Sequence, residues 1–326
     1  MKNILIVTLA IVAWLETGVA QADTFPERPV TMVVAFGPGG STDRMARAMS
    51  TALGEALGQP VRVINKKGAG TLLGNNYLLA QPHDGYTILA SSFSPYLANT
   101  ILEGTATYAI DDFAYINLQW FDMDLIAVNR DSKYSTLPLL LEAIREHPGQ
   151  VKGAVVRGSG GHLIARLLLE KCQIPQQHLN LVTYNGGGMA RAAVAGHVVD
   201  FIVISAQGSE GIRDYLKPLA VAADEPNPKW QAPTIASALM GTGCQLPLLP
   251  GTIRGYAMSA AVKRQYPERF NQIVRATQAV LENSDVITML DNAAIGTRWI
   301  GPEESARIMQ QTYTVFRDYA YLLELH

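Results

Sequence analysis

Apolar and amphipathic stretches alternate over most of the chain. An apolar run at residues 30–35 is typical of a buried strand, and the next stretch repeats its apolar residues at helical spacing as far as Gly58. Two shorter apolar runs, at 61–64 and 86–90, enclose a second helical stretch. This β-α-β-α-β order predicts an α/β fold with largely parallel sheets.

A second series of the same kind begins with the strand-like run at 125–128. After a proline-rich connection come another predicted strand at 252–259 and two closing helices. We expect lobe 1 to comprise residues 23–126 and 254–326, and lobe 2 to comprise residues 127–253. A chain that crosses twice between two lobes forms a hinge of two crossing strands, on which the lobes can close.

Two glycine-rich loops each join an apolar strand to the start of a predicted helix. Glycines let the backbone approach a ligand, and the first N–H groups of a helix have no intrahelical partner and lie at its positive end. Two such loops facing each other would bind a carboxylate without requiring Arg or Lys. Ser41, Thr42 or Asp43 is expected to cap the first helix. The candidate ligand-binding residues of the loops are Phe36, Gly39, Gly40, Ser41, Asp43, Tyr184, Asn185, Gly186, Gly187 and Gly188.

Further candidates lie at other ends of predicted strands. Thr71, Ser91 and Ser92 follow or end strands of lobe 1, where open α/β sheets bind ligands. Ser159 and His162 begin a helix of lobe 2. His162 either donates to a ligand carboxylate or has a structural role, and the sequence leaves this choice open.

Two charged residues next to the glycine loops need separate interpretation. Asp43 would repel an anion, so we expect it to cap the helix or to accept a hydrogen bond from an amine or a bridging water. Arg191 lies one turn into the helix that follows the second loop. It either pairs with a second acidic group of the ligand or belongs to a solvated helix face, which is the commoner case for arginine.

Composition excludes several classes of function. The formal net charge of −2 gives no basic excess that would favour nucleic acid or an anionic membrane. The glycine motifs lack nucleotide-binding spacing, the serines lack a hydrolase elbow, and the six histidines are scattered. We therefore expect no cofactor, no metal and no enzymatic activity. Cys172 and Cys244 could pair in an oxidising compartment or remain buried thiols.

The N-terminal segment has the pattern of an export signal. An apolar run at residues 4–15 follows Lys2, and Ala20-Gln21-Ala22 has the form of a signal-peptidase site. We expect residues 1–22 to be removed by cleavage after Ala22, leaving a protein of the periplasm. The apolar run is shorter than the roughly 20 residues that a membrane span needs.

Eight short motifs follow one another along the chain, at residues 25–30, 36–43, 57–61, 67–70, 84–89, 112–113, 158–162 and 184–188. Their combination and order resemble one known family, the extracytoplasmic solute receptors of tripartite tricarboxylate transporters, or Bug family. The resemblance implies a two-lobed periplasmic binding protein of the type II, Venus-flytrap class. Such a protein holds a carboxylate between its two glycine loops and delivers it to a membrane permease.

Two other functions are compatible with the same predicted fold. The chain could be a periplasmic sensing module that presents its ligand to a two-component receptor, in which case only the partner differs. It could also be an exported enzyme on this scaffold, which would need a nucleophile-base pair or a metal site. For the transport receptor we expect a monomer whose partners are a small-molecule carboxylate and the membrane permease subunits of the transporter.

Overall fold

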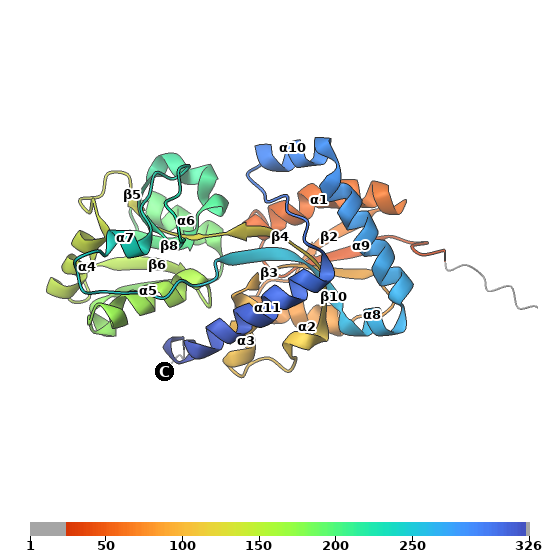
Figure 1. Cartoon of the computed structure of the whole chain (residues 1–326), viewed down its shortest axis with the longest axis horizontal. Helices are drawn as coiled ribbons and strands as arrows, with labels where there is room; N and C mark the ends of the chain where they lie inside the picture. Colours follow the sequence, from red (N-terminus) through yellow and green to blue (C-terminus); the bar gives the residue numbers. More distant parts are fainter. Residues whose placement is uncertain (1–23, 324–326) are drawn as a thin grey trace, which may run out of the picture.

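The computed structural model describes residues 24–323, which form two lobes, each built on a five-stranded sheet (Figure 1). The expected export signal at residues 1–22 lies outside the described residues. Across its sheet, lobe 1 has β2 (Val61–Asn65), β1 (Val30–Val34), β3 (Thr87–Ser94), β10 (Thr252–Ser259) and β4 (Phe113–Asp122). Lobe 2 has β7 (Asn180–Tyr184), β6 (Lys152–Val156), β8 (Phe201–Ser205), β5 (Asp124–Asn129) and β9 (Leu216–Val221).

Both sheets are mixed rather than largely parallel. β1 pairs in parallel with β2 and β3, whereas β10 is antiparallel to both of its neighbours. In the same way, β6 is parallel to β7 and β8, and β5 is antiparallel to β8 and β9. The predicted α/β class is confirmed, with antiparallel strands where the chain passes from one lobe to the other.

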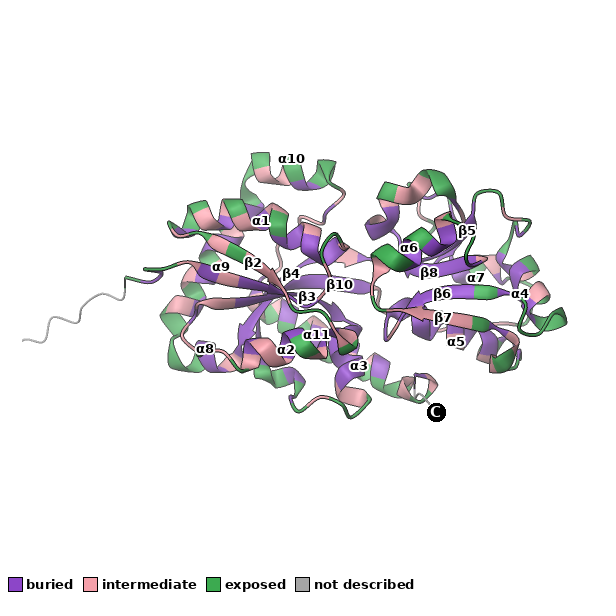
Figure 2. Ribbon diagram, turned by 180° about the vertical axis from the view of Figure 1, so that it is seen from behind, coloured by how far each residue is buried: buried purple, intermediate pink, exposed green. Residues whose placement is uncertain are grey.

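Helices cover both faces of each sheet, so the strands are buried and the outer helix faces are exposed (Figure 2). In lobe 1, α1 and α9 pack on one face, and α2, α3 and α11 on the other. In lobe 2, α4, α5 and α7 cover one face and α6 the other. The α-helices are α1 (Ser41–Leu57), α2 (Leu72–Leu79), α3 (Tyr96–Leu102), α4 (Leu137–Glu146), α5 (Gly160–Lys171), α6 (Gly187–Ala195), α7 (Ile235–Ala238), α8 (Ala260–Gln265), α9 (Pro267–Glu282), α10 (Ser284–Asn292) and α11 (Gly301–Asp318). The 3₁₀ helices are η1 (Ala69–Thr71), η2 (Ile110–Asp112), η3 (Gln176–His178), η4 (Gln207–Tyr215) and η5 (Ala320–Leu322).

Strand β4 is one of the elements that the sequence pattern did not predict; the short helices α3, α8 and α10 are others. Its apolar residues are interrupted by Asn117 and Gln119, which are nevertheless fully buried. The Asn117 amide donates to the Arg298 carbonyl at 2.8 Å, and the Gln119 amide donates to the Gly296 carbonyl at 2.7 Å. These bonds compensate for burying the two amide NH2 groups, because a buried polar group is tolerated when it is hydrogen-bonded. The Oε1 atom of Gln119 has no hydrogen-bond partner among the described residues.

The chain passes from lobe 1 to lobe 2 at Met123, between β4 and β5, and returns through residues 222–251 to β10. All of β5 pairs in the sheet of lobe 2, so the expected boundary at 126/127 falls inside this strand. The last helix also reaches both lobes. Ser305 of α11 accepts a hydrogen bond from the β4 backbone, and the Tyr321 hydroxyl beyond α11 donates to Glu170 of lobe 2.

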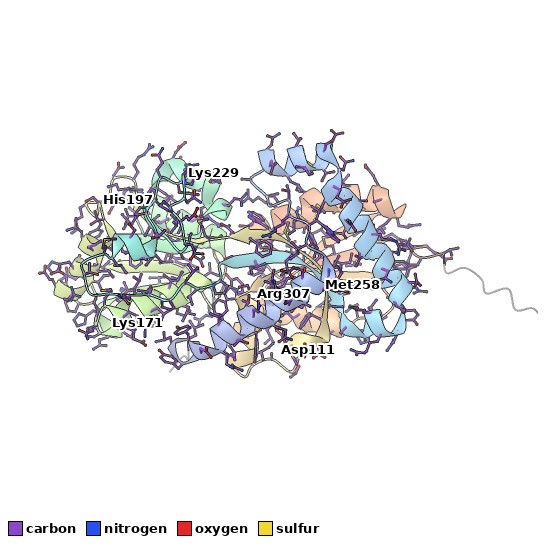
Figure 3. All side chains as sticks on the ribbon, in the orientation of Figure 1. Asp111, Lys171, His197, Lys229, Met258 and Arg307 are labelled. Carbon is purple, nitrogen blue, oxygen red and sulfur yellow. A yellow bond between two sulfur atoms is a disulfide. The ribbon has the colours of Figure 1, made fainter. Side chains whose placement is uncertain are left out.

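Cys172 and Cys244 form a disulfide, which decides between the two alternatives that the sequence left open. Cys172 directly follows Lys171, the last residue of α5, which is labelled in Figure 3. Cys244 belongs to the segment that returns to lobe 1, so the disulfide attaches this segment to lobe 2. The two cysteines are separated by 72 residues in the sequence.

We expect the double variant Cys172→Ser/Cys244→Ser to lose about 2–4 kcal/mol of unfolding free energy, because the disulfide restricts the unfolded chain. Urea denaturation of the oxidised protein and of the variant measures the difference. Adding a reductant should destabilise the wild type and leave the variant unchanged. Equal stability of the oxidised and reduced wild type would contradict the prediction.

Candidate ligand-binding site

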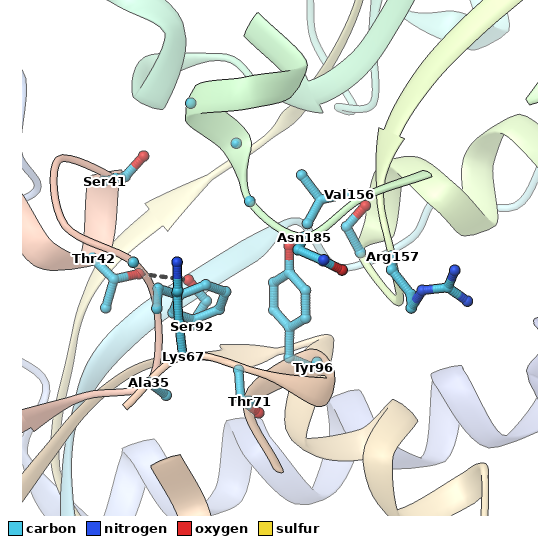
Figure 4. A pocket seen from close by; sticks show the side chains of 18 of the residues that line it. Ala35, Ser41, Thr42, Lys67, Thr71, Ser92, Tyr96, Val156, Arg157 and Asn185 are labelled. Carbon is cyan, nitrogen blue, oxygen red and sulfur yellow. Dashed lines mark hydrogen bonds between the residues drawn. The ribbon is translucent and has the colours of Figure 1, made fainter. Parts of the chain in front are cut away.

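A cavity of about 600 Å³ lies between the two lobes, and both glycine loops line it (Figure 4). The structure therefore brings the two loops to the same space, although more than 140 residues separate them in the sequence. The predicted site residues that line the cavity are Phe36, Gly40, Ser41, Thr71, Ser92, Ser159, Asn185, Gly186, Gly187 and Gly188. Gly39, Asp43, Ser91, His162 and Tyr184 lie outside its wall.

The first glycine loop presents the start of α1 to the cavity. The N-cap residue is Gly40, and within the described chain no side chain caps the helix, so the expected cap by Ser41, Thr42 or Asp43 is wrong. The Thr42 hydroxyl lies 3.0 Å from the hydroxyl of Ser92 instead. The first N–H groups of α1 are consequently available for an acceptor in the cavity.

Asp43 is directed back into the loop and supports its shape. Its carboxylate accepts hydrogen bonds from the Gly39 amide at 2.9 Å, the Arg47 guanidinium at 2.9 Å and the Asn65 amide at 2.8 Å. Burial disfavours the charged form, but the bonds from Arg47, Asn65 and Gly39 outweigh this effect and lower the pKa of Asp43. The negative charge is thereby neutralised behind the loop rather than presented to the cavity.

The second glycine loop presents the start of α6 in the same way. Its N-cap is Gly186, again without a side-chain cap among the described residues. Helix α5, which begins nearby, differs because the Ser159 hydroxyl accepts the His162 N–H at 3.1 Å. The helix starts at this cavity that have glycine as the N-cap are therefore those of α1 and α6, one from each lobe. Thr71, the N-cap of α2, also lines the cavity, and its side chain makes no capping hydrogen bond in the described chain.

His162 has the environment of a structural residue. It is buried, and its Nδ1 accepts a hydrogen bond from the Gly158 backbone at 3.4 Å. Burial, together with the charges of Arg166 and Arg157, lowers its pKa to about 4. A neutral imidazole outside the cavity wall favours the structural alternative over contact with a ligand.

A third loop, just before α2, completes the rim of the cavity. Ala69 and Thr71 both have positive φ, at 44° and 89°, with Gly70 between them at 59°. Such backbone conformations cost free energy in residues other than glycine and occur often in ligand-binding loops. Lys67 of the same loop also lines the cavity.

Sequence reasoning weighed Arg191 as a possible ligand contact and missed the other basic side chains of the cavity wall. Lys67, Arg157, Arg191 and Arg254 all line the cavity. Arg191 is only 9% exposed, so its interpretation as part of a solvated helix face is wrong. The face of α6 that carries Arg191 packs against the rest of lobe 2. Helix α6 has nine residues, so its pattern of apolar positions is too short to indicate which face is buried.

Arg254 belongs to a buried joint between the lobes. Its guanidinium pairs with the Asp122 carboxylate at 3.1 Å and donates to the Ser205 hydroxyl at 2.8 Å. Asp122 also accepts the backbone N–H groups of Gln207 and Gly208, at 2.8 and 2.9 Å. This arrangement connects β4 and β10 of lobe 1 with β8 and η4 of lobe 2 at one end of the cavity.

Asp124 lines the cavity with a buried carboxyl group. Burial, followed by the nearby charge of Asp122, raises its pKa to about 7, and Arg254 partly opposes the shift. Within residues 24–323, its Oδ2 has no hydrogen-bond partner. No cluster of three or more His, Cys, Asp or Glu side chains in this part of the chain has the arrangement of a metal site.

Two lobes around a cavity lined by helix starts define a substrate-binding protein of the type II, Venus-flytrap class. The family model for the tripartite tricarboxylate transporter family receptor matches residues 45–232, which is more than half of the chain. The chain belongs to this family. The resemblance to the Bug family is thereby confirmed, and the family is one of substrate-binding receptors rather than of enzymes.

Individual relatives agree with this assignment. A protein encoded in the tcbD-tcbE intergenic region of Pseudomonas sp. strain P51 is 28% identical over 90% of this chain and 86% of its own length. BugT from Bordetella pertussis is 36% identical over 55% of each chain. None of the helices described is both long and apolar enough to cross a bilayer.

Solved structures share the fold. MatC from Rhodopseudomonas palustris, with bound malate, superposes with a TM-score of 0.77 at 24% identity, covering 92% of this chain and all of the other. The periplasmic binding protein BugD superposes with a TM-score of 0.76 at 23% identity, covering 92% and 98% of the two chains. At these identities the comparison supports the two-lobed fold.

Titration of Asp124 should make stability depend on pH in a defined direction. Its folded pKa of about 7 lies above the ordinary value of 3.8, so between these values the folded state holds a proton that the unfolded state releases. The stability contributed by this group is therefore complete below pH 3.8 and falls as the pH rises to about 7. In Asp124→Asn this loss is absent.

The unfolding free energy of the ligand-free wild type, minus that of Asp124→Asn, should fall between pH 5 and pH 8 by more than about 1.4 kcal/mol, the equivalent of one pKa unit. Urea titrations at the two pH values measure both quantities. A difference that stays constant between pH 5 and pH 8 would show that Asp124 titrates normally.

Proposed function

We propose that this protein captures a small organic carboxylate in the periplasm and delivers it to the membrane permease of a tripartite tricarboxylate-type transporter. The carboxylate binds between the starts of α1 and α6. The observation that carries the proposal is that both helix starts line one cavity, and that neither has a side-chain cap in the described chain. Family membership supports the permease as partner over a two-component sensor.

The binding energy comes from backbone donors that are already in place. A hydrogen bond from an N–H group to a charged acceptor contributes roughly 1.5–3 kcal/mol, and several such donors together offset the desolvation of a carboxylate. The positive ends of two helix dipoles act in the same direction. The basic side chains of the wall add a long-range attraction for anions.

The two lobes close on the ligand in this proposal because each lobe contributes one half of the binding site. A ligand that accepts hydrogen bonds from α1 and α6 at once binds the closed arrangement better than the open one, and so shifts the population toward closure. The connections at Met123 and at residues 222–251 are where the two lobes rotate in this proposal. Export, with cleavage after Ala22, brings the protein to the periplasm.

Structural neighbours support a carboxylate as the ligand. MatC of R. palustris was solved with malate, and another R. palustris protein, which superposes with a TM-score of 0.77 at 21% identity, was solved with adipate. Both of those ligands are carboxylates. The present protein has the same fold, and two glycine-rich helix starts line its cavity.

Side chains added at the glycines test the site directly. Gly40→Val and Gly188→Val should each lower the affinity for bound carboxylates by about tenfold or more, because a branched side chain at the wall displaces the ligand from the N–H groups. A Cβ at Gly40 meets the Gly37 carbonyl at an ordinary 3.5 Å, and one at Gly188 has no atom of the described chain within 4 Å. Calorimetry across mono- and dicarboxylates measures the effect.

Gly211→Val is the matched control. Gly211 is exposed, lies outside the cavity wall, and has open space around its Cβ position within the described chain. Its affinities should equal those of the wild type. The proposal fails if no carboxylate binds the wild type, or if both loop variants bind as tightly as the control.

A further inference from the structure

The wall of the cavity carries more positive than negative charge. Four basic side chains line it, whereas Asp124 is its one acidic lining residue in the described chain. The nearby Asp122 is already occupied by Arg254 and by two backbone N–H groups. A carboxylate at the glycine loops would be held by neutral donors, so these basic groups are not required for that contact.

Arg191 is the buried basic residue of the wall that has no ion pair in the described chain. Its Nε donates to the Ser209 hydroxyl at 2.9 Å and its Nη2 to the Ser205 hydroxyl at 3.3 Å. Both partners are neutral, and among residues 24–323 no carboxylate forms an ion pair with Arg191. A buried charge without a counter-charge is costly, and proteins normally pair such a group.

A second guanidinium approaches from the other lobe. Arg254 of β10 donates to the same Ser205 hydroxyl that Arg191 of α6 contacts. A hydroxyl oxygen has two acceptor positions, so these two donors use both. Burial, and then the charge of Arg254, lowers the pKa of Arg191 to about 10. An anion placed beside the two guanidinium groups would remove this repulsion.

Arg191 also lies next to both glycine loops. Its Nη1 is 2.7 Å from the position that a Cβ on Gly187 would occupy, so glycine at 187 leaves room for the guanidinium. Its Nη2 and the Ser41 hydroxyl are each 2.8 Å from the position of a Cβ on Gly208. A ligand held at the loops therefore reaches the guanidinium with a second group a short chain away.

We propose that Arg191 determines the specificity of the cavity by binding a second anionic group of the ligand, so that the site prefers dianions to monoanions of equal chain length. This inference rests on the proposed function, because the first carboxylate occupies the glycine loops. The guanidinium offers a planar set of N–H donors that matches a carboxylate, and hydrogen bonds between charged groups are the strong ones.

The experiment compares matched pairs of ligands that differ only in the second carboxylate: succinate with butyrate, glutarate with valerate, and adipate with hexanoate. Calorimetry on the wild type should give at least one pair in which the dianion binds about tenfold or more tightly than the monoanion. In Arg191→Leu, the affinity for that dianion should fall by about tenfold or more, while the monoanion changes by less than about threefold. Arg191→Lys, which keeps the charge, should retain part of the preference.

Arg130→Leu is the control, because Arg130 is exposed and lies outside the cavity wall. It removes the same charge from lobe 2 and should leave the ratio of affinities unchanged. A structural role of Arg191, or contact with the same carboxylate as the loops, would weaken both members of a pair by one factor. An unchanged ratio in Arg191→Leu therefore overturns the inference.

The affinities of the wild type can still overturn the inference if Arg191→Leu fails to fold. Equal affinities within all three pairs would overturn the role of Arg191 and leave carboxylate binding at the loops intact. Failure of every carboxylate to bind would instead overturn the proposed function, together with the inference that rests on it. Retention of part or all of the dianion preference in a folded Arg191→Lys, and its loss in Arg191→Leu, would both support a charge contact.

Discussion

Backbone N–H groups at the starts of α1 and α6 have no acceptor among the side chains of the described residues, and the organisation of the site depends on them. Helix starts leave such groups unpaired, and proteins usually satisfy them with a capping side chain. Here Ser159 does so for α5, whereas Gly40 and Gly186 cannot. Because α1 and α6 belong to different lobes, an anion that satisfies both helix starts also connects the lobes.

The charged side chains around the cavity leave the N–H groups of these two helix starts free to bind an anion. Asp43 is neutralised behind the first loop by Arg47 and Asn65, so its carboxylate does not compete with a ligand for the N–H groups. Asp122 and Arg254 compensate each other at the joint between the lobes. Arg191 is also buried, but its hydrogen-bond partners in the described chain are neutral hydroxyls. Its positive charge therefore faces the cavity without a counter-charge, in addition to the neutral backbone donors.

Prediction from sequence succeeded where a pattern was local. The strand before the first loop and the helix that ends at Gly58 agree with the structure, since Gly58 has the left-handed conformation that ends helices. It failed where a distant partner determined the outcome. Asn117 and Gln119 made β4 look unlike a strand, because the carbonyls that bond their amides lie about 180 residues away in the chain. The expected cap failed because the helix begins at Ser41, so that Gly40 occupies the N-cap position and Ser41, Thr42 and Asp43 lie in the first turn.

The sequence by itself determined the two-lobed α/β class, the family, and the two glycine loops, because periodicity, turn residues and motif order are properties of short segments. Only the tertiary structure decided that both loops line one cavity, that Cys172 and Cys244 pair, and that Arg191 is buried. Each of these depends on which segments meet across the sheets and between the lobes. Burial and charge compensation are set by such long-range contacts, and a residue's immediate neighbours in the chain do not encode them.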